Sequence, residues 1–461
     1  MNALLRLQSE LGAIVSVDPL DLAANRADKS GWVADGTPLA IVRATTVDHV
    51  QAALRIATEF RVPVVTRGAG TGLSGGACGT DGSIVLSVAG LTRIIEINPD
   101  DELAVVEAGV INQHFNDVLA KQDLWFAPDP ASKGISTVGG NIATNAGGLL
   151  CAKYGVTREA VLGLTVVLAD GSLLRTGHRT VKGVTGYDLT ALLTGSEGTL
   201  GVIVDATVRV RALTAGTVAT IGAVFDTVIA AAAASALITA ARIRPAVMEL
   251  IDPVALGMVA AYLGPDGSAG LPLGQGAFLL VQTDGPAALA EAEAAVVVLR
   301  RAGGQASLST DAVSGDRLLA IRRAMHPALE QFGRVLIEDV SVPRSRMAEM
   351  FAVIAEISAR TGIPIPTVAH AGDGNLHPNF VIPRGGADDA VVPDEIWAAA
   401  DEMFQAALAL GGTLTGEHGV GVLKRRWLRD EIGDTSLVLQ RQLKAVFDPL
   451  GLLNPGTMFD A

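Results

Sequence analysis

The chain has 461 residues, of which 49% are hydrophobic and 18% are charged, so it is long enough for two or three ordered domains. Its net charge of -13 argues against a nucleic-acid partner, because a phosphate backbone attracts Lys and Arg. Two cysteines, Cys78 and Cys151, cannot make a disulfide framework.

Neither the N-terminal segment nor the most apolar later segment predicts export or membrane insertion. The N-terminal residues, MNALLRLQSELGAIVSVDP, lack the long apolar run and the cleavage site of a secretory signal. The most apolar later segment, residues 228–243, is mostly Ala and is shorter than a bilayer span. Asp226 is a candidate N-cap for this segment, so a packed helix is predicted. We therefore expect a cytoplasmic protein.

The first half of the chain predicts an α+β region built on short strands and glycine loops. Helical periodicity covers residues 47–60, and a strand is expected directly after it at 61–65. Runs rich in Val, Ile and Thr predict further strands at 83–88, 105–109, 164–172 and 201–210.

After about residue 215, long Ala-rich helices alternate with strands. Helices are predicted at 227–242, 287–301, 346–360 and 394–410. The strands between them are predicted at 277–283, 335–342 and 366–371. This alternation predicts an antiparallel sheet covered by helices.

The segment from Gly70 to Gly75 has the spacing G-x-G-x-x-G of a dinucleotide-binding turn. A Rossmann site would need a helix to begin at this motif, whereas more glycine and then a strand follow here. A nicotinamide cofactor is therefore disfavoured. Five glycines between Gly68 and Gly76 are also more than a merely mobile surface loop requires. Without Cβ atoms, such a loop lets backbone N–H groups approach a pyrophosphate.

Two further glycine-rich blocks follow, at residues 128–148 and 194–203. The first of them carries short polar side chains between its glycines, which suits a large polar cofactor better than a packed core. Each block alone is a weak signal, but the order and spacing of all three make a strong one.

Residues 370–380, HAGDGNLHPNF, contain two histidines on either side of an Asp-Gly pair. Asp-Gly favours a two-residue type I′ turn, which would pair His370 with His377 and place Asn379 on the same face. Directly opposed side chains have Cβ atoms about 4.5–5.5 Å apart, so two imidazoles in this register could bind one ion. This arrangement of the imidazoles requires a two-residue turn at Asp373-Gly374.

The later segment TGEHGVG places Glu417 and His418 between glycines. Two imidazoles and one carboxylate would make a three-ligand site for Zn²⁺ or Mn²⁺ that keeps a coordination position for substrate. The alternative is that these residues are solvated polar groups of surface loops.

In their order and spacing, the three glycine blocks resemble the FAD-binding domain of the vanillyl-alcohol-oxidase and p-cresol-methylhydroxylase superfamily. The motifs H-A-G-D-G-N-L-H and G-E-H-G resemble those of its D-lactate dehydrogenase, D-2-hydroxyglutarate dehydrogenase and glycolate oxidase large-subunit branch. The resemblance implies an α+β fold with a two-part FAD-binding domain of the p-cresol-methylhydroxylase type at 1–212. It also implies a substrate domain with a helix-covered antiparallel sheet at 213–430 and a C-terminal segment, 431–461, that returns to the flavin.

The resemblance implies one bound FAD, with the first loop around its pyrophosphate and the second block along the ribityl chain and flavin ring. The first loop has no His, and no Cys before Cys78, so we expect FAD without a covalent link, although Cys151 leaves that question open. The cofactor-binding residues that the resemblance implies are Arg67, Gly68, Ala69, Gly70, Thr71, Gly72, Leu73, Ser74, Pro128, Ser132, Gly134, Ser136, Thr137, Gly139, Gly140, Asn141, Thr144, Asn145, Gly147, Glu197, Gly198, Val202, Ile203 and Asn454.

The resemblance also implies a divalent metal, Zn or Mn, and a catalytic base. The implied metal ligands are His370, His377 and Glu417. His418 would be the base that takes the proton of the substrate hydroxyl. The implied substrate contacts are Arg322, Asn379, His370, His377 and His418.

Together these implications describe an FAD-dependent dehydrogenase that oxidises a D-2-hydroxy acid to the 2-oxo acid by hydride transfer to flavin N5. Where hydroxyglutarate-type enzymes carry a Thr and a Lys, this sequence has His326 and Ile337, which favours D-lactate or a longer apolar substrate. D-2-hydroxyglutarate, glycolate, an O₂-using oxidase of the same fold and a subunit without turnover remain alternatives. Because the chain has no cysteine cluster for an iron–sulfur centre, we expect an external electron acceptor: a cytochrome, a quinone or an electron-transfer flavoprotein. A homodimer is one assembly that the resemblance allows.

Overall fold

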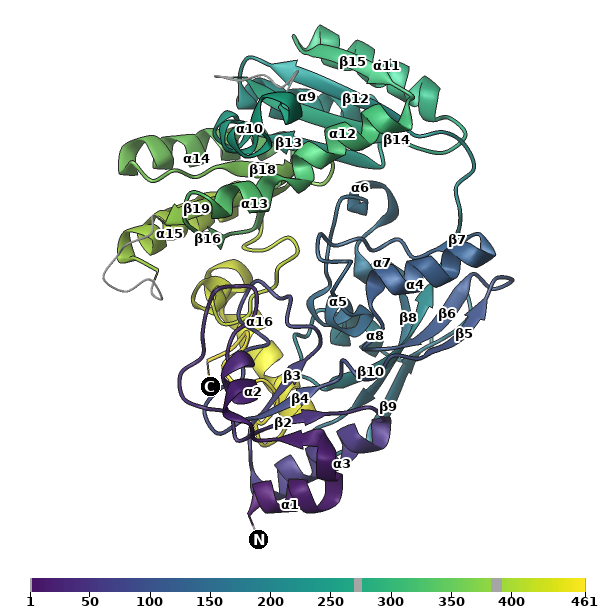
Figure 1. The fold of residues 1–461 in the computed structure, drawn as a ribbon, viewed down its shortest axis with the longest axis vertical. Coiled ribbons are helices and arrows are strands. Elements are labelled where there is room, and N and C mark those ends of the chain that lie inside the picture. Colours follow the sequence, from purple (N-terminus) through teal and green to yellow (C-terminus); the bar gives the residue numbers. More distant parts are fainter. Residues whose placement is uncertain (1, 269–275, 383–391, 461) are drawn as a thin grey trace. The chain divides into compact units, whose positions relative to one another are not determined.

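The computed structural model describes residues 2–268, 276–382 and 392–460 and divides into two compact units (Figure 1). The first unit consists of Met1–Gly148, Gly155–Leu213 and Glu417–Ala461, and the second of Leu149–Tyr154 and Thr214–Gly416. Residues 417–430, which the sequence analysis assigned to the substrate domain, thus lie in the first unit. Hydrogen bonds hold them there: Ser74 Oγ donates to the carbonyl oxygens of His418 and Gly419.

One sheet of the first unit has the strand order β1-β2-β4-β3. Its strands are β1 (Val15–Ser16), β2 (Ala40–Arg43), β4 (Ile84–Ser87) and β3 (Val64–Arg67), and the last three run parallel. The predicted helix is confirmed as α3 (Val47–Phe60), which begins where Thr46 accepts a hydrogen bond from the His49 N–H. Between β3 and β4 the chain forms no helix, so the glycine loop does not open a Rossmann unit.

A second sheet in this unit is antiparallel, in the order β5-β6-β10-β8-β9. Its strands are β5 (Ile94–Asn98), β6 (Leu103–Glu107), β10 (Val202–Arg209), β8 (Val161–Val167) and β9 (Leu173–Gly177), and the short strands β7 (Leu124–Trp125) and β11 (Arg211–Ala212) form a separate pair. Apolar side chains from both sheets, such as Leu86 and Val204, share one buried core. The remaining helices of the unit are α1 (Ala3–Leu11), α2 (Pro19–Ala24), α4 (Asn112–Leu119), α5 (Val138–Thr144), α7 (Thr157–Ala160), α8 (Leu189–Leu193) and α16 (Arg425–Phe447).

The second unit is built on one large sheet in the order β15-β12-β14-β13-β18-β19-β16, with β17 paired to β19. Every strand pair in it is antiparallel, which confirms the predicted sheet type. Its strands are β12 (Ala219–Phe225), β13 (Val247–Ile251), β14 (Ala277–Thr283), β15 (Gln305–Ser309), β16 (Arg334–Ile337), β17 (Val340–Ser341), β18 (Thr367–His370) and β19 (Asn375–Ile382).

Helices cover this sheet because its strands are apolar on both faces. Phe278 and Leu280 pack with apolar residues of α10, α12 and α13, while Leu279 and Val281, which point the other way along β14, are equally buried. The helices of the unit are α6 (Cys151–Tyr154), α9 (Val228–Ala240), α10 (Pro253–Gly267), α11 (Ala288–Arg301), α12 (Ala312–Arg323), α13 (Met325–Glu330), α14 (Met347–Thr361) and α15 (Asp394–Ala409).

The Ala-rich helix α9 begins one residue later than its predicted cap implies. Thr227, and not Asp226, accepts the capping hydrogen bond from the Ala230 N–H. Its side chains pack against strands β12, β13 and β14. Among the described residues, no helix combines the length and the apolar character that crossing a membrane requires.

Candidate active site

The hairpin of β18 and β19 carries both histidines, but in a different register from the predicted one. His370 pairs with Asn375, and Val368 pairs with His377. The turn is four residues long, because the His370 carbonyl accepts hydrogen bonds from the N–H groups of both Asp373 and Gly374. Only Gly374 of the Asp-Gly pair has a positive φ, 95°. The predicted two-residue type I′ turn, which needs a positive φ at both positions, is therefore wrong.

The two histidines nevertheless share one face of the sheet. Moving the cross-strand partner of His370 by two residues, from 377 to 375, keeps every side chain on its own side, because side chains alternate with a period of two. His370 and His377 are therefore diagonal neighbours, with ring centroids 5.0 Å apart and ring planes at 86°. Both side chains are buried. In this diagonal arrangement, a ring nitrogen of each imidazole can bind the same ion.

His370 contacts a buried carboxylate that was not predicted from the sequence. Glu249 of β13 lies directly opposite His370 in the pairing of β13 with β18, and its Oε1 atom is 2.6 Å from His370 Nδ1. Its other oxygen, Oε2, accepts a hydrogen bond of 2.7 Å from Arg322 Nε. Burial raises the pKa of Glu249, but the charges and hydrogen bonds of His370 and Arg322 lower it further, so it lies below its ordinary value. Glu249 is thus held as a carboxylate.

His377 also faces a buried carboxylate. Its Nδ1 atom is 3.9 Å from Asp339 Oδ1, and the second Asp339 oxygen accepts a hydrogen bond from the Thr415 hydroxyl. On the same face, directly opposite His370, Asn375 is buried, and its Oδ1 atom has no hydrogen-bond partner among the described residues. Buried polar atoms normally have partners, so this amide oxygen points to a group that binds here.

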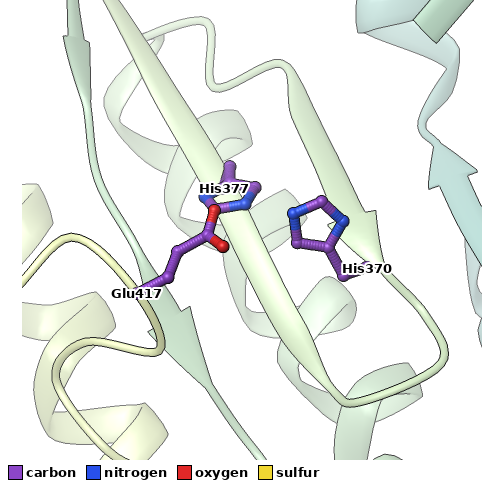
Figure 2. A group of neighbouring side chains, drawn as sticks. All are labelled: His370, His377 and Glu417. Carbon is purple, nitrogen blue, oxygen red and sulfur yellow. The ribbon is translucent and has the colours of Figure 1, made fainter. Parts of the chain in front are cut away.

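Glu417 directly follows Gly416, the last residue of the second unit. One ligand atom of Glu417 and one of each histidine lie within 4.8 Å of one another, and Figure 2 shows the Glu417 carboxylate turned toward both rings. Gly147 makes room for this residue, and Gly416 makes room for Asn375. A Cβ atom on Gly147 would come within 2.4 Å of Glu417 Oε2, and one on Gly416 within 2.5 Å of the Asn375 side chain.

The remaining predicted residues of the second unit lie on neighbouring elements. Arg322 belongs to the last turn of α12, and Asn379 lies two residues after His377 on β19. The Asn379 amide nitrogen donates to the carbonyl oxygens of Pro366 and His377, which fixes its orientation. In the first unit, the His418 ring nitrogen Nε2 is 3.9 Å from Glu417 Oε1.

The three glycine blocks meet within the first unit. A Cβ atom on Gly68 would lie 2.6 Å from Thr137 Oγ1, so the first loop and the second block are in close contact. The Glu197 N–H donates to the Ala143 carbonyl, which joins the third block to the second. The third block then leads through Gly198 into β10, whose first residues are Val202 and Ile203.

Asn454 connects this assembly to the C-terminal segment. Its Oδ1 atom accepts a hydrogen bond from the Thr66 N–H, and its Nδ2 atom donates to the carbonyl oxygens of Gly76 and Glu197. The amide thus bridges the strand before the first loop, the end of that loop and the third block. Arg67 also connects separate segments, since its Nη1 atom donates to the carbonyl oxygens of Ala27 and Ala77.

Three buried polar atoms beside these loops have no hydrogen-bond partner in the described part of the chain: Thr66 Oγ1, Ser136 Oγ and Asn141 Nδ2. Such orphaned groups cost free energy unless something binds them, so the region fits a large polar cofactor. Ser132 and the exposed Gly134 belong to the turn before Ser136, in which the Ser132 carbonyl accepts hydrogen bonds from the N–H groups of Ile135 and Ser136. The remaining predicted residues of the first loop and second block lie in the loop after β3 and in or around α5, and these are Ala69, Gly70, Thr71, Gly72, Leu73, Pro128, Gly139, Gly140, Thr144 and Asn145.

Cys78 lies shortly after the first loop and is buried. Burial, reinforced by the nearby Asp28, raises the pKa of the Cys78 thiol. A protonated thiol is a weak nucleophile, so this residue is unsuited to a covalent link with a flavin.

The buried Glu197 carboxylate predicts a pH dependence of stability. Burial raises its pKa from 4.5 to about 7, against the hydrogen bonds from the Val420 and Gly421 N–H groups and the charge of Lys424. An acid whose pKa is higher in the folded state stabilises the fold fully below its unfolded pKa, and this contribution is lost as the pH rises toward 7. A rise from 4.5 to about 7 corresponds to a whole loss of about 3 kcal/mol, at 1.36 kcal/mol per pKa unit.

Glu197→Gln should remove this dependence, because the amide stays neutral at every pH. In urea unfolding at pH 5 and pH 8, the free energy of unfolding of the wild type, relative to that of the variant, is expected to be lower at pH 8. An equal difference at both pH values would contradict the prediction.

Comparisons with known proteins agree with this architecture. A family model described as FAD linked oxidases, C-terminal domain, matches residues 215–458, and one described as FAD binding domain matches residues 38–177. The solved structure of p-cresol methylhydroxylase with substrate bound is similar in fold, with a TM-score of 0.80 and 18% identity, over 99% of this chain and 96% of that one.

Curated relatives match over almost the same length. The glycolate oxidase subunit GlcD of Bacillus subtilis is 39% identical over 429 residues, which cover 92% of this chain and 89% of the relative. The D-lactate dehydrogenase of Archaeoglobus fulgidus is 34% identical over 422 residues, which cover 90% of each chain. The resemblance seen in the sequence is thereby confirmed: the chain belongs to the FAD-linked oxidases, as an FAD-linked oxidoreductase of the D-lactate dehydrogenase and glycolate oxidase group.

Proposed function

We propose that the protein is a metal-assisted, FAD-dependent dehydrogenase that oxidises a D-2-hydroxy acid to the corresponding 2-oxo acid. The observation that carries the proposal is the ligand set of His370, His377 and Glu417, whose ligand atoms lie within 4.8 Å of one another. A glycolate oxidase subunit and a D-lactate dehydrogenase among its relatives support the substrate class.

The donor set fits a divalent metal such as Zn²⁺ or Mn²⁺. Two imidazoles and one carboxylate leave a coordination position for substrate, and metal-ligating histidines usually have a carboxylate or carbonyl on their other ring nitrogen. Here Glu249 lies 2.6 Å from Nδ1 of His370, and Asp339 lies 3.9 Å from Nδ1 of His377. When bound, the metal supplies a Lewis acid that lowers the pKa of the substrate hydroxyl. FAD, which the orphaned polar atoms of the first unit would help to hold, would supply the hydride acceptor at N5.

The chain's own residues would bind and deprotonate the substrate. Arg322 donates from Nε to Glu249, and its guanidinium group would hold the substrate carboxylate through its terminal nitrogens. His418 would accept the hydroxyl proton on its imidazole, a group suited to proton transfer near neutral pH. Asn379, oriented by its two backbone hydrogen bonds, would present its amide oxygen as a further substrate contact.

The substrate side chain is proposed to be apolar, as in D-lactate or a longer monocarboxylate. Ile337 lies opposite Asn379 in the pairing of β16 with β19 and offers no cation for a second carboxylate. His326 is exposed, and its Nε2 atom is 3.3 Å from Glu330, so it is engaged with a carboxylate of the chain itself. These positions disfavour a dicarboxylate such as D-2-hydroxyglutarate. We further propose an external electron acceptor in place of O₂.

Anaerobic bleaching of the flavin tests the proposal. The purified yellow protein should lose its flavin absorbance on addition of D-lactate or D-2-hydroxybutyrate and keep it with the L-enantiomers. Removal of the metal with a chelator should abolish bleaching, and Zn²⁺ or Mn²⁺ should restore it. Bleaching that persists after the metal is fully removed would refute the metal role, and stoichiometric hydrogen peroxide under air would identify an oxidase instead.

A further inference from the structure

We infer that Glu249 is a positioning residue that fixes the metal ligand His370 and the substrate-binding Arg322 with one carboxylate. By holding these two groups at a set spacing, it makes the site selective for acids whose hydroxyl is on the carbon next to the carboxylate. This inference rests on the proposed function and adds to it a residue and a specificity rule.

The contact with His370 follows from the pairing of the strands. Glu249 and His370 occupy the same register position in β13 and β18, so their side chains leave the sheet side by side. The 2.6 Å contact engages His370 Nδ1. A proton on Nδ1 directs the lone pair to Nε2, which is the form that binds a metal. Glu249 therefore selects the tautomer of the ligand as well as its orientation.

The contact with Arg322 uses the second oxygen of the same carboxylate. Arg322 lies in the last turn of α12, so its side chain reaches Glu249 from a helix that packs over this face of the sheet. The 2.7 Å hydrogen bond to Nε fixes the plane of the guanidinium group. The terminal edge of the guanidinium group, which is separate from the Nε–H, would then bind the substrate carboxylate with two hydrogen bonds.

The environment of Glu249 argues against an incidental ion pair. The residue is fully buried, with an exposed fraction of 0%, and a buried carboxylate is costly unless its oxygens are paired. Its neighbours two residues away on the same face of β13 are Val247 and Ile251, both apolar and buried. An apolar residue would suit this position if packing were its only role.

The double contact implies a spacing rule for the substrate. In a 2-hydroxy acid, the hydroxyl that approaches the metal and the carboxylate that approaches Arg322 are attached to the same carbon skeleton at adjacent positions. In a 3-hydroxy acid, one more carbon separates them. A metal ligand and an arginine that share one rigid support cannot adjust independently to this change. Loosening the support should therefore relax the preference for 2-hydroxy acids.

The test compares Glu249→Gln with Asp252→Asn. Asp252 is a buried carboxylate just after the same strand, and it accepts hydrogen bonds from the N–H groups of Ala255 and Thr367. Zn²⁺ binding is measured by calorimetry on the flavin-loaded, metal-free proteins. Glu249→Gln should weaken it about 10- to 100-fold, raise the KM for D-lactate and lower the preference for D-lactate over D-3-hydroxybutyrate. Asp252→Asn should leave all three quantities near their wild-type values.

Flavin content and circular dichroism report whether each variant is folded. If Glu249→Gln does not fold, Glu249→Asp, which keeps the charge but withdraws it by one methylene, takes its place with a smaller expected loss. A folded Glu249 variant with wild-type Zn²⁺ affinity, KM and preference would overturn the inference alone. A wild type that binds no metal would overturn the proposed function as well, so the two failures are distinguishable.

Discussion

Glu417→Gln is expected to lower the turnover number on the order of a thousandfold, since Lewis-acid activation is worth several kcal/mol. The amide has the size of the carboxylate, so it fits beside Gly147, where a Cβ atom would already come within 2.4 Å of Glu417 Oε2. It is neutral, however, and a weaker ligand for a divalent cation. We therefore expect the loss of activity to accompany a loss of bound metal, measured by elemental analysis of the purified protein.

The matched control for this variant is Glu402→Gln. Glu402 is an exposed carboxylate of α15 that pairs with Arg360, and exposed ion pairs contribute little to stability. This variant should keep wild-type metal content and turnover. Both variants should retain FAD, because the glycine blocks and their orphaned polar atoms are untouched. Full activity of Glu417→Gln together with full metal content would exclude Glu417 as a ligand.

Local sequence patterns predicted the elements that frame the site. The helix at 47–60 was expected with its observed bounds, because Thr46 and the apolar spacing of α3 specify it locally. The antiparallel sheet of the second unit followed from runs of β-branched and apolar residues between Ala-rich helices. These features depend on residues close in sequence, so they can be read without knowledge of the fold.

The residues that hold the site residues in place come from distant parts of the sequence, so no local sequence pattern predicts their contacts. Glu249 meets His370 only because β13 and β18 are neighbours in the sheet, although 121 residues separate them in the chain. Asp339 and Asn454 are likewise ordinary polar residues until the fold brings them to His377 and to the glycine blocks. A search for buried Glu or Asp within apolar strands could have singled out Glu249, which interrupts the run VMELI.

The error in the hairpin register arises in the turn itself. The Asp-Gly pair favours a two-residue turn, yet here the His370 carbonyl accepts hydrogen bonds from two successive N–H groups, and the turn takes in Ala371 and Gly372 as well. A Cβ atom on Gly372 would come within 2.7 Å of Ala152, so the turn also packs closely against α6, a contact that the local sequence does not record. The two histidines still share one face of the sheet, because the register differs from the predicted one by two residues and side chains alternate with a period of two.

His418→Gln is expected to lower the turnover number about 10²- to 10⁴-fold, the range that a general base supplies. Glutamine can still hydrogen-bond a substrate hydroxyl, but it cannot take its proton at neutral pH. The Ser74 hydroxyl donates to the backbone carbonyl oxygen of His418, so the loop should keep its position when the side chain changes. Metal content and FAD content are therefore expected to match the wild type, which separates this variant from Glu417→Gln.

Two further measurements make the role of His418 specific. The control is His114→Gln, a change of the same type at an exposed position of α4, which should leave turnover unchanged. In His418→Ala, added imidazole should restore part of the lost turnover, because a free base can enter the space that the side chain vacates and accept the hydroxyl proton. A His418→Gln variant that keeps wild-type turnover, or that loses its metal, would show that His418 is not the base but a binding or structural residue.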